Sequence, residues 1–306
     1  MSAQPLLGGV ELGGTKCVCI LGTGPDDIRE HTRIPTGDCD ETLAQIRARF
    51  EAWRSVHGPM QAIGLASFGP LDLQPASSHY GEITSGAKPG WIGANILERL
   101  GAGWGIPVGF NTDVNAAALA EGRWGGARDL SDYAYITVGT GIGVGLVVAG
   151  RPVLGCTHTE LGHVRLARYP GDRWPGACPY HGDCVEGLAS GPAIAARMGQ
   201  SASEIPSDNP VWELVAHALS QLLQTLFLAT APRRILMGGG VIEHRPELLA
   251  QTRHLLVRGM NGYLDLEDLT GGVDRYAVPA ALGSLAGPAG ALALAALAHG
   301  SGSWTC

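Results

Sequence analysis

Clustered positive charge and long apolar runs are both missing from this 306-residue sequence. Charged residues make up 16% of the chain, the formal net charge is −7, and no run of lysine or arginine occurs. A polyanion such as nucleic acid therefore finds no electrostatic footprint. No uncharged apolar stretch reaches bilayer-spanning length, and the N-terminal residues lack the charged and apolar regions of a signal peptide. We expect a soluble, cytoplasmic protein that binds neither nucleic acid nor a membrane.

Cysteine is also scarce. Seven cysteines in a chain this long are too few and too irregularly spaced for a disulfide framework. Reduced thiols and a metal site fit this usage better. The cysteines are Cys17, Cys19, Cys39, Cys156, Cys178, Cys184 and Cys306.

What the sequence has in quantity is apolar residues and glycine. Hydrophobic residues make up 45% of the chain and glycine occupies 46 positions, which is typical of a compact α/β protein with many tight turns. The length exceeds the usual size of one hydrophobic core, so we expect two domains with a cleft between them. A cleft favours an enzyme.

Two segments share one pattern, an apolar strand, a glycine-rich turn and a second apolar strand. They are residues 8–24 and residues 133–153, and their repetition predicts two similar lobes. Elsewhere apolar spacing predicts helices and strands in alternation, which is typical of α/β folds. The predicted helices are residues 41–53, 95–102, 115–124, 212–230 and 287–300, and the predicted strands are residues 61–67, 106–110 and 233–241.

Both glycine turns are candidate phosphate sites, because backbone N–H groups without side chains in the way suit a triphosphate. An ordinary hairpin turn explains the first of them equally well when it is taken alone. The second adds a hydroxyl group, and two such turns in facing lobes fit one nucleotide. The residues are Gly13, Gly14, Thr15 and Lys16 in the first turn and Gly139, Thr140 and Gly141 in the second.

Asp113 is a candidate general base. It follows an apolar strand and precedes an alanine-rich helix, and a helix N-terminus stabilises a carboxylate that can accept a proton. Simple N-capping of that helix is the alternative, and on spacing alone it is the commoner explanation.

A compact group of potential metal ligands lies between Glu160 and Glu186. Their order is H-x14-C-x2-H-x2-C, and four such ligands at short spacings suit tetrahedral zinc. With no open coordination position the site would be structural, holding an irregular Gly/Pro-rich loop. Four unrelated surface residues are the alternative. The ligands are His163, Cys178, His181 and Cys184.

Taken together, these motifs resemble the ROK family of bacterial sugar kinases, within the actin-like ATPase (ribonuclease H-like) fold. Residues 138–146, VGTGIGVGL, followed by Gly155 and by Gly162 and His163, are similar to the family signature. The resemblance extends almost end to end. It implies two α/β lobes and a homodimer. Residues 1–115 with the C-terminal helix 286–306 would form the small lobe, and residues 116–285 the large lobe.

The resemblance also implies roles for individual residues. The segment around Asp113, TDVNAAA, is similar to the family's N-D-x-N-x-A-A motif, whose aspartate is the catalytic base. Glu160 and Glu186 would bind sugar hydroxyls, and His163 would join the sugar pocket to the zinc. MgATP would lie on the two glycine turns. The adenosine strand and turn would be residues 232–242, with nucleotide contacts at Pro192, Gly238, Gly239, Gly240, Val241 and Ile242.

Two departures from the common pattern look like the fructokinase branch. Glu11 stands where many relatives have aspartate, and residues 178–184, CPYHGDC, replace a glucokinase-type cysteine motif. Phosphorylation of D-fructose at its 6-hydroxyl is accordingly the expected reaction. Mannose, glucose and N-acetylhexosamines are alternative substrates, and a sugar-sensing regulator is a remote alternative, disfavoured because the glycine hairpin begins at once.

Overall fold

The computed structural model describes residues 4–86, 88 and 90–301. By its internal contacts the chain divides into two compact units. Unit 1 comprises Met1–Arg128, Pro152–His158 and Leu285–Cys306, and unit 2 comprises Asp129–Arg151 and Thr159–Ser284. The lobe boundaries at residues 115 and 285 remain predictions. Cys306, Ala87 and Pro89 lie outside the described residues.

Unit 1 contains a five-stranded mixed sheet with strand order β3-β2-β1-β4-β5. The β1–β2 and β2–β3 pairs are antiparallel, whereas β1–β4 and β4–β5 are parallel. The strands are β1 (Leu7–Leu12), β2 (Lys16–Gly24), β3 (Asp27–Pro35), β4 (Ala62–Ser67) and β5 (Val108–Thr112). The helices are α1 (Cys39–His57), α2 (Ile96–Gly101), α3 (Asp113–Trp124) and α11 (Ala286–Ser301).

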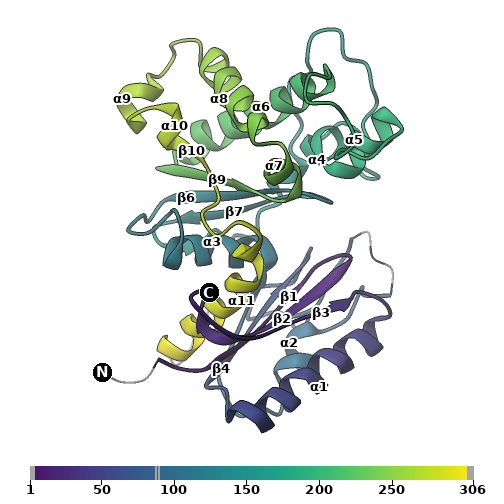
Figure 1. The fold of residues 1–306 in the computed structure, drawn as a ribbon, viewed down its shortest axis with the longest axis vertical. Coiled ribbons are helices and arrows are strands. Elements are labelled where there is room, and N and C mark those ends of the chain that lie inside the picture. Colours follow the sequence, from purple (N-terminus) through teal and green to yellow (C-terminus); the bar gives the residue numbers. More distant parts are fainter. Residues whose placement is uncertain (1–3, 87, 89, 302–306) are drawn as a thin grey trace. The chain divides into compact units, whose positions relative to one another are not determined.

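Alternation along β2 divides its buried side chains between two cores, because successive side chains of a strand point to opposite faces. Cys19 and Leu21 pack in one core with Phe50 of α1. Ile20 packs in the other core with Leu292 of α11. Figure 1 shows α1 and α11 on opposite sides of this sheet.

Helix α11 approaches the backbone of the sheet closely because glycines lie beneath it. A Cβ atom at Gly64 would lie 1.8 Å from the Ala291 carbonyl oxygen, and one at Gly109 would lie 2.4 Å from the Leu294 carbonyl oxygen. Any side chain at either position would collide with the helix backbone. Glycine is therefore required for this packing.

Unit 2 is built on a second five-stranded sheet, with strand order β10-β9-β6-β7-β8. The β6–β7 pair is antiparallel, and β6–β9 and β9–β10 are parallel. The strands are β6 (Tyr133–Val138), β7 (Ile142–Val148), β8 (Arg151–Pro152), β9 (Arg234–Gly238) and β10 (Ala277–Pro279).

The long apolar helix α6 is the principal helix of unit 2, and it packs against α4 and α8 (Figure 1). The α-helices are α4 (Val185–Ala189), α5 (Gly191–Met198), α6 (Val211–Thr230), α7 (Gly240–His244), α8 (Pro246–Met260), α9 (Leu266–Thr270) and α10 (Val273–Tyr276). Two short 3₁₀ helices are η1 (Leu161–His163) and η2 (Gly283–Leu285). Among the described residues, no helix combines the length and apolarity that a membrane span requires.

Candidate functional site

The first group of candidate residues lies at one edge of the unit 1 sheet. Parallel pairing aligns Leu12 with Ser67 and Ser67 with Thr112, so β1, β4 and β5 end side by side. The first glycine turn follows β1 and Asp113 follows β5. Ligands of open α/β sheets bind outside the carboxyl ends of such strands.

Asp113 occupies the first position of α3, but it does not cap the helix. Thr112 is the cap, and its hydroxyl oxygen accepts a hydrogen bond from the Asn115 N–H at 3.2 Å. The Asp113 Oδ1 atom accepts from the N–H of the next residue, Val114, at 2.8 Å. The capping interpretation of Asp113 is therefore wrong, and its half-buried carboxylate lies in the first turn of α3, where the helix dipole favours negative charge.

The first glycine turn joins β1 to β2 and is braced from two sides. The Gly13 N–H donates to the Lys16 carbonyl at 3.0 Å, and the Thr36 hydroxyl donates to the Gly13 carbonyl at 2.8 Å. A Cβ atom at Gly14 would meet nothing within 4 Å, and residues 14–16 are exposed. The turn is thus both a hairpin and an open backbone surface that suits a phosphate group.

Lys88 contacts this turn from a distant part of the chain. The sequence did not identify it as a site residue. Its ammonium group donates to the Gly14 carbonyl at 2.7 Å and to the Thr36 carbonyl at 2.9 Å. A compositional signal was present, since Lys16 and Lys88 are the two lysines of a chain in which every other basic side chain is arginine or histidine. Both lysines lie at the same turn.

In unit 2 the second glycine turn meets two other glycine-containing segments. The Gly139 N–H donates to the Gly141 carbonyl at 2.9 Å, and the Gly139 carbonyl accepts from the Gly191 N–H at 2.8 Å. Helix α5 therefore begins against the turn, with Pro192 exposed in its first turn. A Cβ atom at Gly139 would lie 4.0 Å from the Gly240 nitrogen, at the start of α7. The structure thus brings together the predicted phosphate turn and the predicted adenosine segment.

The segment after β9 depends on glycine for its path. Gly239 has φ of +89°, and a Cβ atom there would lie 2.6 Å from the Val138 nitrogen, so a side chain is excluded. Val241 and Ile242 are buried, with 7% and 5% of their surface exposed. A nucleotide at this segment would contact backbone rather than these two side chains.

The two candidate sugar-binding carboxylates flank the same turn. The Glu186 Oε2 atom accepts a hydrogen bond from the Ile142 N–H at 3.0 Å. Glu160 directly precedes η1, which lies against β7 so closely that a Cβ atom at Gly162 would be 1.7 Å from the Ile142 carbonyl oxygen. Desolvation, with a smaller contribution from repulsion by Glu186, raises the pKa of Glu160 to about 7, although part of the residue is exposed to solvent.

The predicted metal ligands converge in space. One ligand atom from each of the four residues lies within 4.8 Å of all the others. His163 Nδ1 lies 3.7 Å from Cys178 Sγ and 3.5 Å from Cys184 Sγ, and His181 Nδ1 lies 3.7 Å from Cys178 Sγ. Ligands at the usual zinc distances and tetrahedral angles lie roughly 3.3–3.8 Å apart. The donor set therefore fits a structural zinc ion, and the residues fall together rather than being unrelated. We call residues 178–184 the metal knuckle.

A backbone hydrogen bond orients one of the cysteines of the knuckle. The Gly187 N–H donates to Cys184 Sγ at 3.5 Å, and such a hydrogen bond stabilises a thiolate. Coordination of zinc through the Nδ1 atom of His163 would leave its Nε2 atom outside the coordination sphere.

The model of the ROK family matches residues 7–298. A fructokinase of Pediococcus pentosaceus is 41% identical over 290 residues, 95% of this chain and 97% of that protein. A fructokinase of Zymomonas mobilis is 38% identical over 300 residues, 97% of this chain and 98% of that protein. A solved ROK hexokinase from Thermus thermophilus superposes with a TM-score of 0.74 at 28% identity, covering 95% of this chain and 98% of that one.

The chain belongs to the ROK family. The predicted actin-like ATPase fold is confirmed, with two mixed five-stranded sheets and their helices.

Proposed function

We propose that the chain is a fructokinase, which transfers the γ-phosphoryl group of MgATP to the 6-hydroxyl of D-fructose. The observation that carries this proposal is the similarity to fructokinases, at 38–41% identity over 95–97% of the chain. The products are fructose 6-phosphate and ADP.

In unit 1 Asp113 acts as the general base. It takes the proton of the sugar hydroxyl while that oxygen attacks the γ-phosphorus and the bond from phosphorus to the bridging oxygen of ADP breaks. The exposed backbone of Gly14 and Thr15, with the Lys16 ammonium group, is suited to the phosphate charge. Lys88 supports this turn through its carbonyl groups.

In unit 2 the Gly139–Gly141 turn, against which the first residue of α5 packs, is the second phosphate site. Residues 238–242 contact the adenosine. Glu160 and Glu186 accept hydrogen bonds from the sugar hydroxyls, and His163 contacts the sugar through Nε2. Zinc, when bound, pins the irregular loop that carries the knuckle. Mg²⁺ neutralises phosphate charge.

A coupled assay of ADP release across several sugars tests the substrate. We expect kcat/KM for D-fructose to exceed those for mannose, glucose, N-acetylglucosamine and N-acetylmannosamine by about tenfold or more, the scale on which pocket shape discriminates similar ligands. A higher value for any of the other sugars would replace fructose as the substrate. No turnover with any hexose would favour a sugar-sensing role instead.

We also propose a homodimer, which the family resemblance implies. Light scattering should then give twice the 31.8 kDa mass of the chain. A mass of one chain at micromolar concentration would contradict it.

A further inference from the structure

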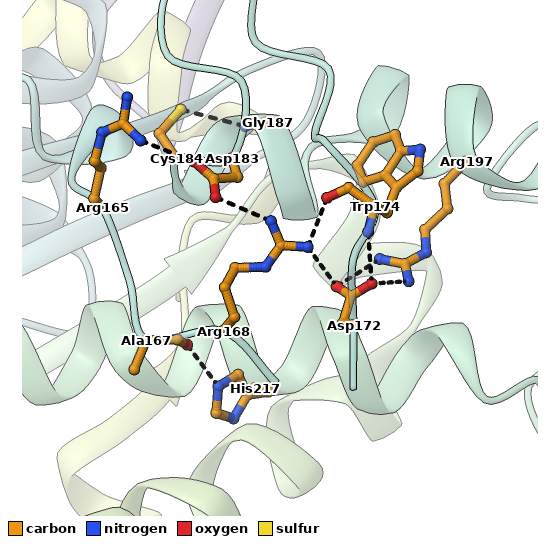
Figure 2. Close-up of polar contacts among 10 residues, drawn as sticks. All are labelled: Arg165, Ala167, Arg168, Asp172, Trp174, Asp183, Cys184, Gly187, Arg197 and His217. Carbon is orange, nitrogen blue, oxygen red and sulfur yellow. Dashed lines mark hydrogen bonds and ion pairs between the residues drawn. The ribbon is translucent and has the colours of Figure 1, made fainter. Parts of the chain in front are cut away.

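Four charged side chains form a cluster that connects the metal knuckle to residues outside it, and none of them is a predicted metal or sugar ligand. Figure 2 shows this Arg–Asp cluster, which consists of Arg168, Asp172, Asp183 and Arg197. Arg168 is its centre. Its Nη1 atom donates to Asp183 Oδ2 at 3.0 Å, and its Nη2 atom donates to Asp172 Oδ2 at 3.0 Å and to the Trp174 carbonyl at 2.6 Å.

The Asp172 end of the cluster is rigidly held. Arg197 donates to both Asp172 oxygens, at 2.6 Å and 3.1 Å, and the Asp172 side chain is only 7% exposed. The hydrogen bonds from Arg197 are the main reason that the pKa of Asp172 is lowered to about 2. Arg168 is therefore anchored on a buried carboxylate that is ionised at neutral pH.

The other end of the cluster leads directly into the candidate site. Asp183 immediately precedes Cys184, which is both a metal ligand and the N-cap of α4. Glu186 lies in the first turn of α4, and its carboxylate accepts from the Ile142 N–H. A shift of Asp183 would therefore displace a ligand and a sugar-binding carboxylate together.

We propose that Arg168 is a positioning residue that acts through Asp183 to hold the metal knuckle and Glu186 in place. Its guanidinium group suits this role because a planar fork can bind two carboxylates and a carbonyl at once. The effect on the sugar rests on the proposed function, whereas the effect on the metal does not.

The test compares Arg168→Met with Arg165→Met in the zinc-loaded protein. Arg165 donates to the same Asp183 at 3.1 Å, but its side chain is 70% exposed, so its ion pair contributes little. We expect Arg168→Met to weaken zinc affinity by about 10–100-fold in a chelator competition, the usual effect of losing an outer partner of a metal site. It should also raise the KM for fructose more than the KM for ATP. Arg165→Met should leave all three quantities within about twofold.

A second variant separates positioning from general stabilisation. Asp183→Asn keeps the side-chain shape but removes the charge that Arg168 binds, and it should weaken zinc binding in the same direction. In the double variant the combined effect should be smaller than the sum of the two, because both substitutions break the contact between Arg168 and Asp183. Additive effects, or wild-type zinc affinity in either single variant, would overturn the proposal. If Arg168→Met does not fold, Asp183→Asn alone decides. Inactivity of the wild-type protein toward fructose would remove the proposed function but leave the zinc measurements valid.

Discussion

At the scale of single residues, Asp113 has the most direct consequence for chemistry. Thr112 supplies the cap of α3, so Asp113→Asn should leave the helix intact. We expect kcat to fall by about 10²–10⁴-fold, the usual contribution of a general base, with the KM for sugar largely unchanged. Steady-state kinetics at saturating ATP measures this, and a melting temperature near that of the wild type is the control. Near-normal turnover would remove Asp113 from the base role.

Glu160 should make stability depend on pH. Its pKa is raised from 4.5 to about 7 in the folded protein. Between these two pH values the folded protein therefore keeps a proton on Glu160 that the unfolded chain has released. The stability associated with the protonated form is complete below pH 4.5 and is lost as the pH rises to about 7.

Glu160→Gln mimics the protonated form at every pH. The melting temperature of this variant minus that of the wild type, both measured without sugar, should therefore increase as the pH rises from 5 to 8. A constant difference across that range would show that Glu160 does not titrate there.

The sequence predicted most of the candidate residues because each carries distinctive chemistry in a recognisable motif. It could not decide between base and cap for Asp113, since both need a carboxylate at a strand-to-helix junction. Lys88 was missed because its role is a contact with the Gly14 and Thr36 carbonyls, which are distant in the chain. The Arg–Asp cluster was missed for the same reason.

At the scale of elements, the metal knuckle should depend on its thiolates. Cys178→Ser removes one of four predicted ligands, so the protein should lose zinc and the loop carrying Glu160 and Glu186 should loosen, because structural zinc contributes directly to local folding. Zinc content and protease sensitivity of the loop measure this. Cys156→Ser is the matched control, since Cys156 is exposed and outside the cluster. Stoichiometric zinc and full activity in Cys178→Ser would refute a structural role.

The packing of α11 on its sheet gives a prediction about stability. Gly64→Ala would place a methyl carbon 1.8 Å from the Ala291 carbonyl oxygen, which neither backbone can avoid without moving. Overpacking of this kind costs about 1–3 kcal/mol or more. Gly37→Ala is the control, because a Cβ there meets nothing within 4 Å. Equal denaturant midpoints for the two variants would contradict the close approach.

The elements that the sequence predicted are those with strong periodicity. Helices α1, α3, α6 and α11 and strands β4, β5 and β9 occur where apolar spacing placed them, and the glycine hairpins are β1–β2 and β6–β7. The polar, alternately exposed strand β3 was not predicted, because its burial is confined to one side chain near its end. The short helices α4 and α5 were also missed, since their positions follow from the knuckle and from Gly139 rather than from local sequence.

At the scale of the whole molecule, a glycine hairpin occurs in both sheets, as the repeated sequence pattern predicted, and each sheet also contains parallel pairs. The assignment of residues 152–158 to unit 1, between two stretches of unit 2, was not foreseen. Such a crossing depends on tertiary contacts, among them the 2.9 Å hydrogen bond from the Leu71 N–H to His158 Nε2. Local sequence carries no signal for a contact of that range.

The proposed activity transfers the γ-phosphoryl group of ATP to one particular hydroxyl of fructose. Product analysis by ³¹P and ¹³C NMR, after incubation of the purified protein with MgATP and D-fructose, tests it most directly. We expect ADP and fructose 6-phosphate in equal amounts, and neither product with the Asp113→Asn variant on the same timescale. Fructose 1-phosphate, or ADP with free phosphate and unmodified sugar, would contradict it.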